Sequence, residues 1–166
     1  MKKCWLILVL AAFLTGCGAQ ETFETVSDIY DAPAMAQMRQ LEIALPKEAA
    51  VPSMENEDAG KIYLCNGYTL TVQTLAGGDL DRTMRQLTGF GREQLTVMET
   101  QVEGIDRYAC VWSAAGEGGD QIGRAVILDD GSYHYAVTVM ADSASAGELA
   151  ETWQEILKSA KLSSTD

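Results

Sequence analysis

The stretch Ile62–Val72, with the sequence IYLCNGYTLTV, decides the fold of this chain. Two runs of β-prone residues flank Asn66-Gly67, a dipeptide that accepts the positive φ angles of a two-residue type I′ turn. Such a turn pairs Cys65 with Tyr68 and Tyr63 with Leu70, so that their four side chains share one face. The stretch therefore predicts an antiparallel β-hairpin with one buried face.

The residues on either side of this hairpin predict five more strands and two helices. Alternation of apolar and polar residues indicates strands, whereas apolar residues at positions i, i+4 and i+7 indicate amphipathic helices. A segment rich in Glu, Asp, Pro and Gly, residues 47–60, is expected to be a loop. Strands are expected at residues 41–45, 95–100, 107–114, 122–128 and 133–141, and helices at residues 79–88 and 145–160.

Both predicted helices carry signals at their ends. Asp79 or Gly78 can cap the first helix, and Gly89 suits its C-terminal end. Ser145-Ala146-Gly147-Glu148 has the spacing of a capping box, which predicts the start of the second helix. That helix has a wide apolar stripe that includes Trp153 and Ile156, and a stripe of this size must be buried against the sheet.

The expected fold class is α+β. Connections of only a few residues join antiparallel neighbours, so the chain predicts a single antiparallel sheet of about six or seven strands flanked by two main helices. The element order, together with the closing run of Tyr133–Val139 into Trp153–Ser159, resembles the PsbP/Mog1-type α/β/α sandwich over residues 41–162. Many members of that group are accessory or assembly factors and some are lipoproteins, so the resemblance implies an accessory role and assigns no site residues.

The N-terminal residues have the parts of an export signal. Lys2-Lys3 is followed by an apolar run, Cys4–Leu14, which is shorter than the about 20 residues that a membrane-spanning helix needs. Leu14-Thr15-Gly16-Cys17 then resembles the lipobox of bacterial lipoproteins, in which the cysteine sulfur receives a diacylglyceryl group and the chain is cut before the cysteine. The resemblance implies that Cys17 is lipidated. An ordinary secretory signal with a chance cysteine is the alternative.

These features predict four parts of the chain and one location. Residues 1–16 are expected to be a removed signal peptide, 17–40 a lipidated cysteine and flexible tether, 41–162 the globular domain and 163–166 a polar tail. Two or three acyl chains on Cys17 would hold the protein in one leaflet, because each buried CH₂ contributes about 0.8 kcal/mol. The expected location is therefore the extracytoplasmic face of the cell membrane, with the membrane as a partner.

The charge of the chain restricts its partners. The formal net charge is −12, and loss of Lys2 and Lys3 with the signal would make it two units more negative. A strongly acidic domain repels nucleic acid and anionic lipid surfaces, so no nucleic-acid partner is expected. Solubility alone explains such a charge, and binding of a cation or a basic partner is the alternative.

Cys65 and Cys110 are the cysteines left for the domain. In an oxidising compartment they could form a disulfide, and two buried thiols acting as small hydrophobic side chains are the alternative. The chain has no CxxC pattern, so neither a metal site nor thioredoxin-like chemistry is predicted.

Acidic pairs and one histidine are the remaining candidates for chemistry. Asp79 with Asp81, and Asp129 with Asp130, could bind a cation or a small ligand, although their positions at a helix start and in a turn favour a structural role for both pairs. His134 is the single histidine and no G-x-S-x-G pattern accompanies it, so a catalytic base is not expected there.

The expected function is therefore that of a non-enzymatic accessory or interaction domain of the cell envelope with a protein partner there. No cofactor, catalytic residue or metal site is expected. A small-ligand or cation-binding module with a pocket between sheet and helix is the alternative, and a hydrolase is a more remote one.

Overall fold

The fold is described from a computed structural model over residues 38–49, 51–56, 60–116 and 118–163. Ala36–Asp166 forms one compact unit, and the statements below concern the described residues of that unit alone. The lipobox, Cys17 and the tether up to residue 37 lie outside the described residues, as do residues 164–166 of the expected tail.

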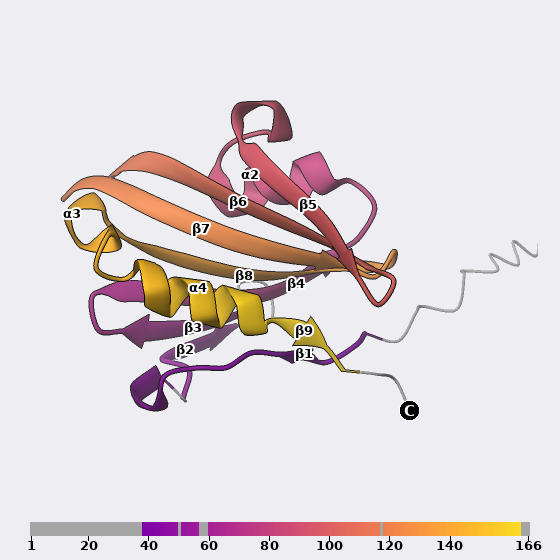
Figure 1. The fold of residues 1–166 in the computed structure, drawn as a ribbon, viewed down its shortest axis with the longest axis horizontal. Helices are drawn as coiled ribbons and strands as arrows, with labels where there is room; N and C mark the ends of the chain where they lie inside the picture. Colours follow the sequence, from indigo (N-terminus) through magenta and orange to yellow (C-terminus); the bar gives the residue numbers. More distant parts are fainter. Residues whose placement is uncertain (1–37, 50, 57–59, 117, 164–166) are drawn as a thin grey trace, which may run out of the picture. The chain divides into compact units, whose positions relative to one another are not determined.

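A seven-stranded antiparallel sheet is the centre of the fold (Figure 1). Its strands lie in the order β2-β3-β4-β8-β7-β6-β5, and every neighbouring pair is antiparallel. The expected α+β class and strand number are confirmed. The strands are β2 (Met54–Asn56), β3 (Gly60–Cys65), β4 (Tyr68–Ala76), β5 (Thr96–Val102), β6 (Ile105–Gly116), β7 (Gly119–Asp129) and β8 (Tyr133–Asp142).

The hairpin predicted at Ile62–Val72 is confirmed in its register. Strands β3 and β4 pair Cys65 with Tyr68 and Tyr63 with Leu70, and the turn glycine Gly67 has φ of 83°. Tyr63, Tyr68 and Leu70 are buried in the same core cluster. The local turn chemistry therefore sets the register that places these side chains in the core.

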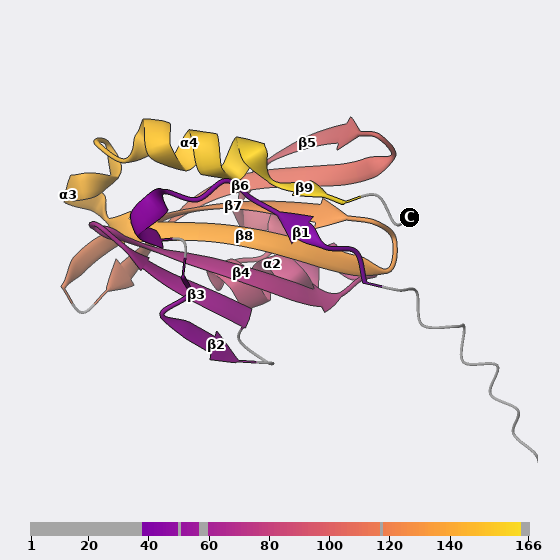
Figure 2. The same cartoon turned by 90° about the horizontal axis from the view of Figure 1, so that it is seen from below.

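Two helices cover opposite faces of the sheet (Figure 2). Alternation along β8 separates the faces. Tyr135 packs in the cluster that holds Trp153 of α4 (Ala150–Ser159), whereas the neighbouring Ala136 packs with Met84 of α2 (Leu80–Thr88). Asp79 caps α2 by accepting a hydrogen bond from the backbone N–H of Arg82, and Gly89 ends the helix, as predicted.

The larger core lies under α4. Trp153 is fully buried there, with its ring edge against Tyr68 at a centroid distance of 6.2 Å, and the Arg124 guanidinium lies 5.8 Å from the Trp153 ring. Burial of this apolar face is the main reason that α4 stays on the sheet. No helix among the described residues has the length and apolar character to cross a membrane.

The start of α4 differs from the prediction. The expected capping box at Ser145–Glu148 is wrong, because Ser143–Ala146 forms a separate short helix, α3, and α4 begins after Leu149 without a side-chain cap. The segment 47–60 was also more structured than expected. It contains the 3₁₀ helix η1 (Lys47–Ala49) and the edge strand β2, and a second 3₁₀ helix, η2 (Arg92–Gln94), precedes β5.

The two ends of the domain pair with each other. β1 is shorter than the predicted strand 41–45 and contains only Leu41–Glu42, which pairs with β9 (Lys161–Leu162) in a separate two-stranded ladder. Ser163 extends this ladder by donating its N–H to the carbonyl of Gln40. Gln40 and Ser163, which the prediction assigned to the tether and the tail, therefore contact each other beside this ladder.

Candidate functional site

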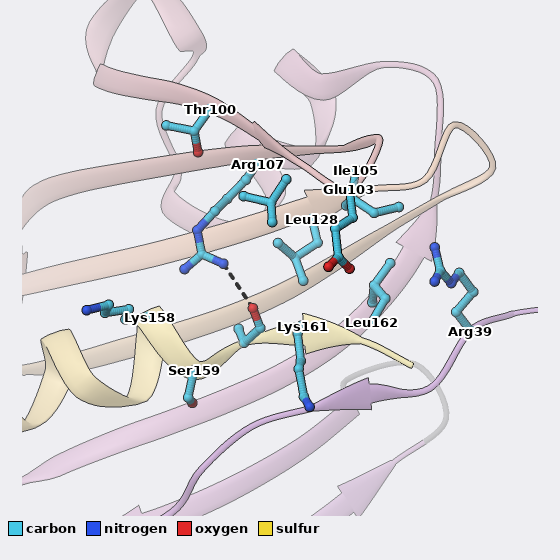
Figure 3. Close-up of a pocket in the computed structure, with 12 residues that line it drawn as sticks. Arg39, Thr100, Glu103, Ile105, Arg107, Leu128, Lys158, Ser159, Lys161 and Leu162 are labelled. Carbon is cyan, nitrogen blue, oxygen red and sulfur yellow. Dashed lines mark hydrogen bonds between the residues drawn. The ribbon is translucent and has the colours of Figure 1, made fainter. Parts of the chain in front are cut away.

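A groove of about 470 Å³ lies between the C-terminal end of α4 with β9 on one side and the β5–β6 hairpin on the other (Figure 3). We call it the basic groove. Its volume is in the range of small-molecule sites, which run from about 300 to 1,000 Å³. The lining residues are Arg39, Thr100, Val102, Glu103, Ile105, Arg107, Leu128, Lys158, Ser159, Ala160, Lys161 and Leu162.

Positive charge is concentrated in the basic groove. Four of its lining residues are basic and one, Glu103, is acidic, although the chain has 24 acidic residues against 12 lysines and arginines. The local charge is therefore opposite in sign to that of the whole protein. Such a local reversal attracts anions to the groove while the rest of the surface repels them.

Arg107 is the most constrained of the four cations. Its guanidinium donates hydrogen bonds to the carbonyl oxygens of Ala160, at 3.0 Å, and of Leu157 (Figure 3 shows the first of these). These carbonyls lie at the C-terminal end of α4, where the helix dipole favours a cation. Partial burial lowers the pKa of Arg107, yet an arginine stays charged throughout the physiological range.

Arg39 fixes the chain that precedes β1. Its backbone N–H donates to the Tyr135 hydroxyl at 2.8 Å, and its Nε donates to the carbonyl of Ser163 at 3.0 Å. The prediction placed Arg39 in a flexible tether, and the structure places it in the groove wall. A residue at the start of the described part of the chain therefore helps to form this groove.

The two lysines differ in their partners. Lys161 forms an ion pair with Glu42 of β1 at 3.1 Å, and its side chain extends toward β1 in Figure 3. Among the described residues, no carboxylate forms an ion pair with Lys158, Arg39 or Arg107. Arg39 is close enough to Asp130 for its charge to contribute to the lowered pKa of that carboxyl, so within the described ranges Arg107 and Lys158 are the groove cations most open to an anion from outside.

The rest of the lining is largely apolar. Leu128 is almost fully buried at 3% exposure, Ile105 and Leu162 are half-buried, and Val102 is 59% exposed at the groove edge. In the view of Figure 3, Ile105, Leu128 and Leu162 lie between Arg107 and Arg39. The site therefore combines an apolar surface with cations at its borders, and this combination suits a ligand with an apolar body and an anionic group.

The predicted acidic residues have structural partners. Asp79 caps α2, and Asp81 accepts hydrogen bonds from the Arg92 backbone N–H at 2.7 Å and from the Arg85 guanidinium at 2.8 Å. These hydrogen bonds, that of Arg92 first, lower the pKa of Asp81. The carboxylates therefore fix the ends of α2 and η2, and their contacts are those of capping residues.

Asp129 and Asp130 organise the turn between β7 and β8. Asp129 accepts from the Gly131 N–H, while Asp130 accepts from the N–H groups of Ser132 and Tyr133 and from the Tyr135 hydroxyl. Burial alone would raise the pKa of Asp130, but these hydrogen bonds outweigh it and lower the pKa. Within the described ranges, no group of three or more His, Cys, Asp and Glu side chains is arranged to hold a metal ion.

His134 faces α2, and it is fully buried. Its Nδ1 lies 2.7 Å from the Thr83 hydroxyl, and its Nε2 lies 3.2 Å from the Asp129 carboxylate without the geometry of a hydrogen bond. We call these three residues the histidine cluster. A hydroxyl, an imidazole and a carboxylate are the groups of a hydrolase triad, but here the hydroxyl and the imidazole are both buried, with Thr83 3% exposed and His134 fully buried. Thr83 also lines a small cavity of about 180 Å³ beside Asp79 and Gln86.

The structure does not join Cys65 to Cys110. They belong to strands β3 and β6, which are separated in the sheet by β4, β8 and β7. With strands about 4.8 Å apart, this separation far exceeds the roughly 4.4–6.8 Å between the Cα atoms of a disulfide. The proposed disulfide is therefore wrong for this fold. Cys110 is instead a buried thiol packed with Trp112, and burial raises its pKa to about 11.

Sequence reasoning missed the basic groove because its residues are far apart in the chain. Arg39, Arg107 and Lys158 come from three distant segments. A usable signal was present: lysine and arginine are scarce in this acidic chain, and each of these three stands next to a predicted sheet or helix end.

Comparisons with solved structures identify the fold. The structure of LpqN, described as involved in cell envelope biogenesis of Mycobacterium tuberculosis, matches with a TM-score of 0.54 and 7% identity over 78% of this chain and 86% of that one. CyanoP, the cyanobacterial PsbP of Synechocystis sp. PCC 6803, matches with a TM-score of 0.52 and 8% identity over 77% and 95%. The chain therefore has a PsbP-like fold, as the resemblance implied.

Comparisons of the sequence do not assign this chain to a family. Neither a scan against protein-family models nor a search of curated proteins finds a match. At 7–8% identity the structural likeness concerns the fold alone, and folds of this kind host different functions. The function has to be argued from the site.

Proposed function

We propose that this chain is a lipid-anchored, non-enzymatic accessory domain on the extracytoplasmic face of the cell membrane that binds an anionic component of the envelope through the basic groove. The observation that carries the binding role is the concentration of Arg39, Arg107 and Lys158 around an apolar surface in an otherwise acidic protein. The lipobox Leu14–Cys17 supports the anchor, and the shared fold of LpqN, an envelope biogenesis protein, agrees with the location.

The charge pattern favours this role over cation binding. The groove has one acidic lining residue, Glu103, and the four predicted aspartates have structural partners. A pocket between sheet and helix was expected for a small-ligand module, and the basic groove corresponds to that description with the opposite preference in charge. A protein partner in the envelope stays part of the proposal.

The anchor is tested with full-length protein expressed in a bacterium that processes lipoproteins. Intact mass of the membrane fraction should show a diacylglyceryl or triacyl group on an N-terminal Cys17. Cys17→Ser should leave the protein unlipidated and with its signal uncut. Digestion of the wild-type protein by protease added to intact cells without a cell wall would show that it lies on the outer face of the membrane. An unmodified cysteine in the wild type would contradict the anchor.

The binding role is tested by crosslinking in cells. A photoreactive amino acid at Thr100, an exposed groove residue, should capture an envelope component, while the same amino acid at Ser113, exposed on β6 outside the groove lining, should not. Identical products from both positions would show that the groove is not the contact.

A further inference from the structure

We infer that the ligand of the basic groove is a single-chain anionic amphiphile, a molecule with a phosphate or carboxylate head and a linear apolar chain. This inference rests on the proposed function, because the tether would hold the groove close to a membrane that contains such molecules. It goes further by naming the chemical class and by assigning head and chain to separate residues.

The head is assigned to the side of the groove with Arg107 and Lys158. The Arg107 guanidinium uses two N–H groups on the carbonyls of Leu157 and Ala160, and an arginine has five, so it can bind an anion without leaving α4. Lys158 lies one residue past Leu157 and is exposed. Together they offer one cation held by hydrogen bonds and one exposed cation, an arrangement suited to a phosphate or carboxylate.

The chain is assigned to the apolar surface. Ile105 and Leu162 are half-buried, and Val102 at the edge leaves 59% of its surface exposed. A simple anion would leave this surface in water. A cavity of about 470 Å³ also exceeds what a free phosphate needs. Covering these side chains with a hydrocarbon chain contributes about 25 cal/mol for each Å² of apolar surface removed from water.

Glu103 gives the inference a directional test. It is the acidic residue in the lining and is exposed at the β5–β6 turn. A negative charge there opposes an anionic head and would favour a cation. Glu103→Gln should therefore tighten the binding of an anionic amphiphile, whereas it should weaken the binding of any cationic ligand.

The experiment measures binding by calorimetry to the chain without its predicted signal, residues 17–166, which carries Cys17→Ser so that it stays unlipidated. The probe is decyl phosphate below its critical micelle concentration. Decyl maltoside has the same chain with a neutral head, inorganic phosphate has the head alone, and octyl phosphate has a shorter chain. We expect decyl phosphate to bind at least about tenfold more tightly than maltoside or phosphate. It should also bind about tenfold more tightly than octyl phosphate, whose chain is shorter by two CH₂ groups.

Matched variants locate the binding. Lys158→Gln should weaken binding of decyl phosphate by about threefold or more, while Lys61→Gln, which removes an exposed lysine on β3 outside the groove lining, should not. Val102→Glu should weaken it by about tenfold, and Val111→Glu, at another exposed valine, should leave it unchanged. All four positions are on the surface, so circular dichroism should show folded protein throughout.

Three results would overturn the inference. Equal affinity for inorganic phosphate would indicate a simple anion site, and equal affinity for decyl maltoside would indicate an apolar site without charge selection. Absence of decyl phosphate binding, with binding of an acidic Glu-Leu peptide instead, would assign the groove to a protein segment. Each of these results leaves the anchor and the crosslinking test of the proposed function intact, so the two failures are distinguishable.

Discussion

The basic groove and the histidine cluster contain similar chemistry in opposite environments. Both join charged or titratable side chains from distant strands and helices. The histidine cluster is closed, with His134 fully buried between the sheet and α2, whereas the basic groove is open and three of its cations have no ion-pair partner among the described residues. Access to solvent therefore separates a group that holds the fold together from one that can bind a ligand.

Residue types alone would suggest that the histidine cluster, and not the basic groove, is the functional site, and this contrast in burial favours the opposite interpretation. Histidine with a hydroxyl and a carboxylate is the more familiar sign of catalysis, and lysines on an exposed helix end are usually unremarkable. His134 is fully buried, whereas Arg107 lies in an open groove beside an apolar surface, and on this difference we base the proposal that the groove is the binding site. The predictions below test the division from the largest expected effect to the smallest.

Substitution of the buried histidine should have the largest effect on stability. His134→Ala leaves a cavity between β8 and α2 and removes the partner of the Thr83 hydroxyl, so we expect a loss of about 2–4 kcal/mol in the free energy of unfolding. Urea denaturation measures it. Binding of decyl phosphate at temperatures where the variant is folded should not change, because the histidine cluster is not part of the groove lining.

A matched change at the same contact refines this prediction. Thr83→Val keeps the volume and removes only the hydroxyl, so it should cost about 1–2 kcal/mol. A His134→Ala protein as stable as the wild type would contradict the structural role of the histidine cluster.

Local sequence signals explain how much of the fold could be predicted. The hairpin at Asn66-Gly67 and the Asp79 cap of α2 depend on residues a few positions apart. Turns and caps have sequence preferences over such short distances, so both could be predicted. The β1–β9 ladder joins residues about 120 positions apart through two residues on each side, and such short strands have no periodic pattern. The capping-box prediction failed because Ser145 lies inside the short helix α3, which ends at Ala146, and α4 begins only at Ala150.

The site was less predictable than the fold. The basic groove depends on where three distant segments meet, and the prediction had assigned Arg39 to the tether. The acidic pairs could be found in the sequence because the residues of each pair lie within two positions of each other. Acidic residues at a helix start or in a turn commonly bind backbone N–H groups there, which is what these aspartates do. Polar residues that are close in this sequence stabilise local structure, whereas the groove assembles polar residues that are far apart.

Arg107 should connect the two kinds of region. Arg107→Leu removes two hydrogen bonds to the C-terminal carbonyls of α4 and one cation of the groove. We expect a loss of about 1–2 kcal/mol in the free energy of unfolding, together with weaker decyl phosphate binding. Arg107→Lys should recover part of the affinity and less of the stability, because lysine lacks the two-pronged geometry. Equal recovery of both properties would show that charge alone matters at this position.

Acid should weaken the β7–β8 turn through Asp130. Its pKa lies below the ordinary value of 3.8 because of the hydrogen bonds described above. The unfolded chain therefore binds this proton more tightly, so the stabilisation is present above about pH 4–5 and is lost as the pH falls through the lowered pKa. Asp130→Asn should cost about 1 kcal/mol at pH 7, and the difference from wild type should shrink as the pH falls toward 3. A gap that stays constant with pH would exclude this role.

Lys158 should contribute nothing measurable to stability. Its side chain is exposed and forms no ion pair within the described ranges, so Lys158→Gln should change the free energy of unfolding by less than about 0.5 kcal/mol, as should Lys61→Gln. Binding should then separate these two lysines although stability does not. A Lys158 variant that loses both stability and affinity would show that the groove cations stabilise the fold, as the histidine cluster does. That result would contradict the distinction drawn here between an open binding groove and a buried structural cluster.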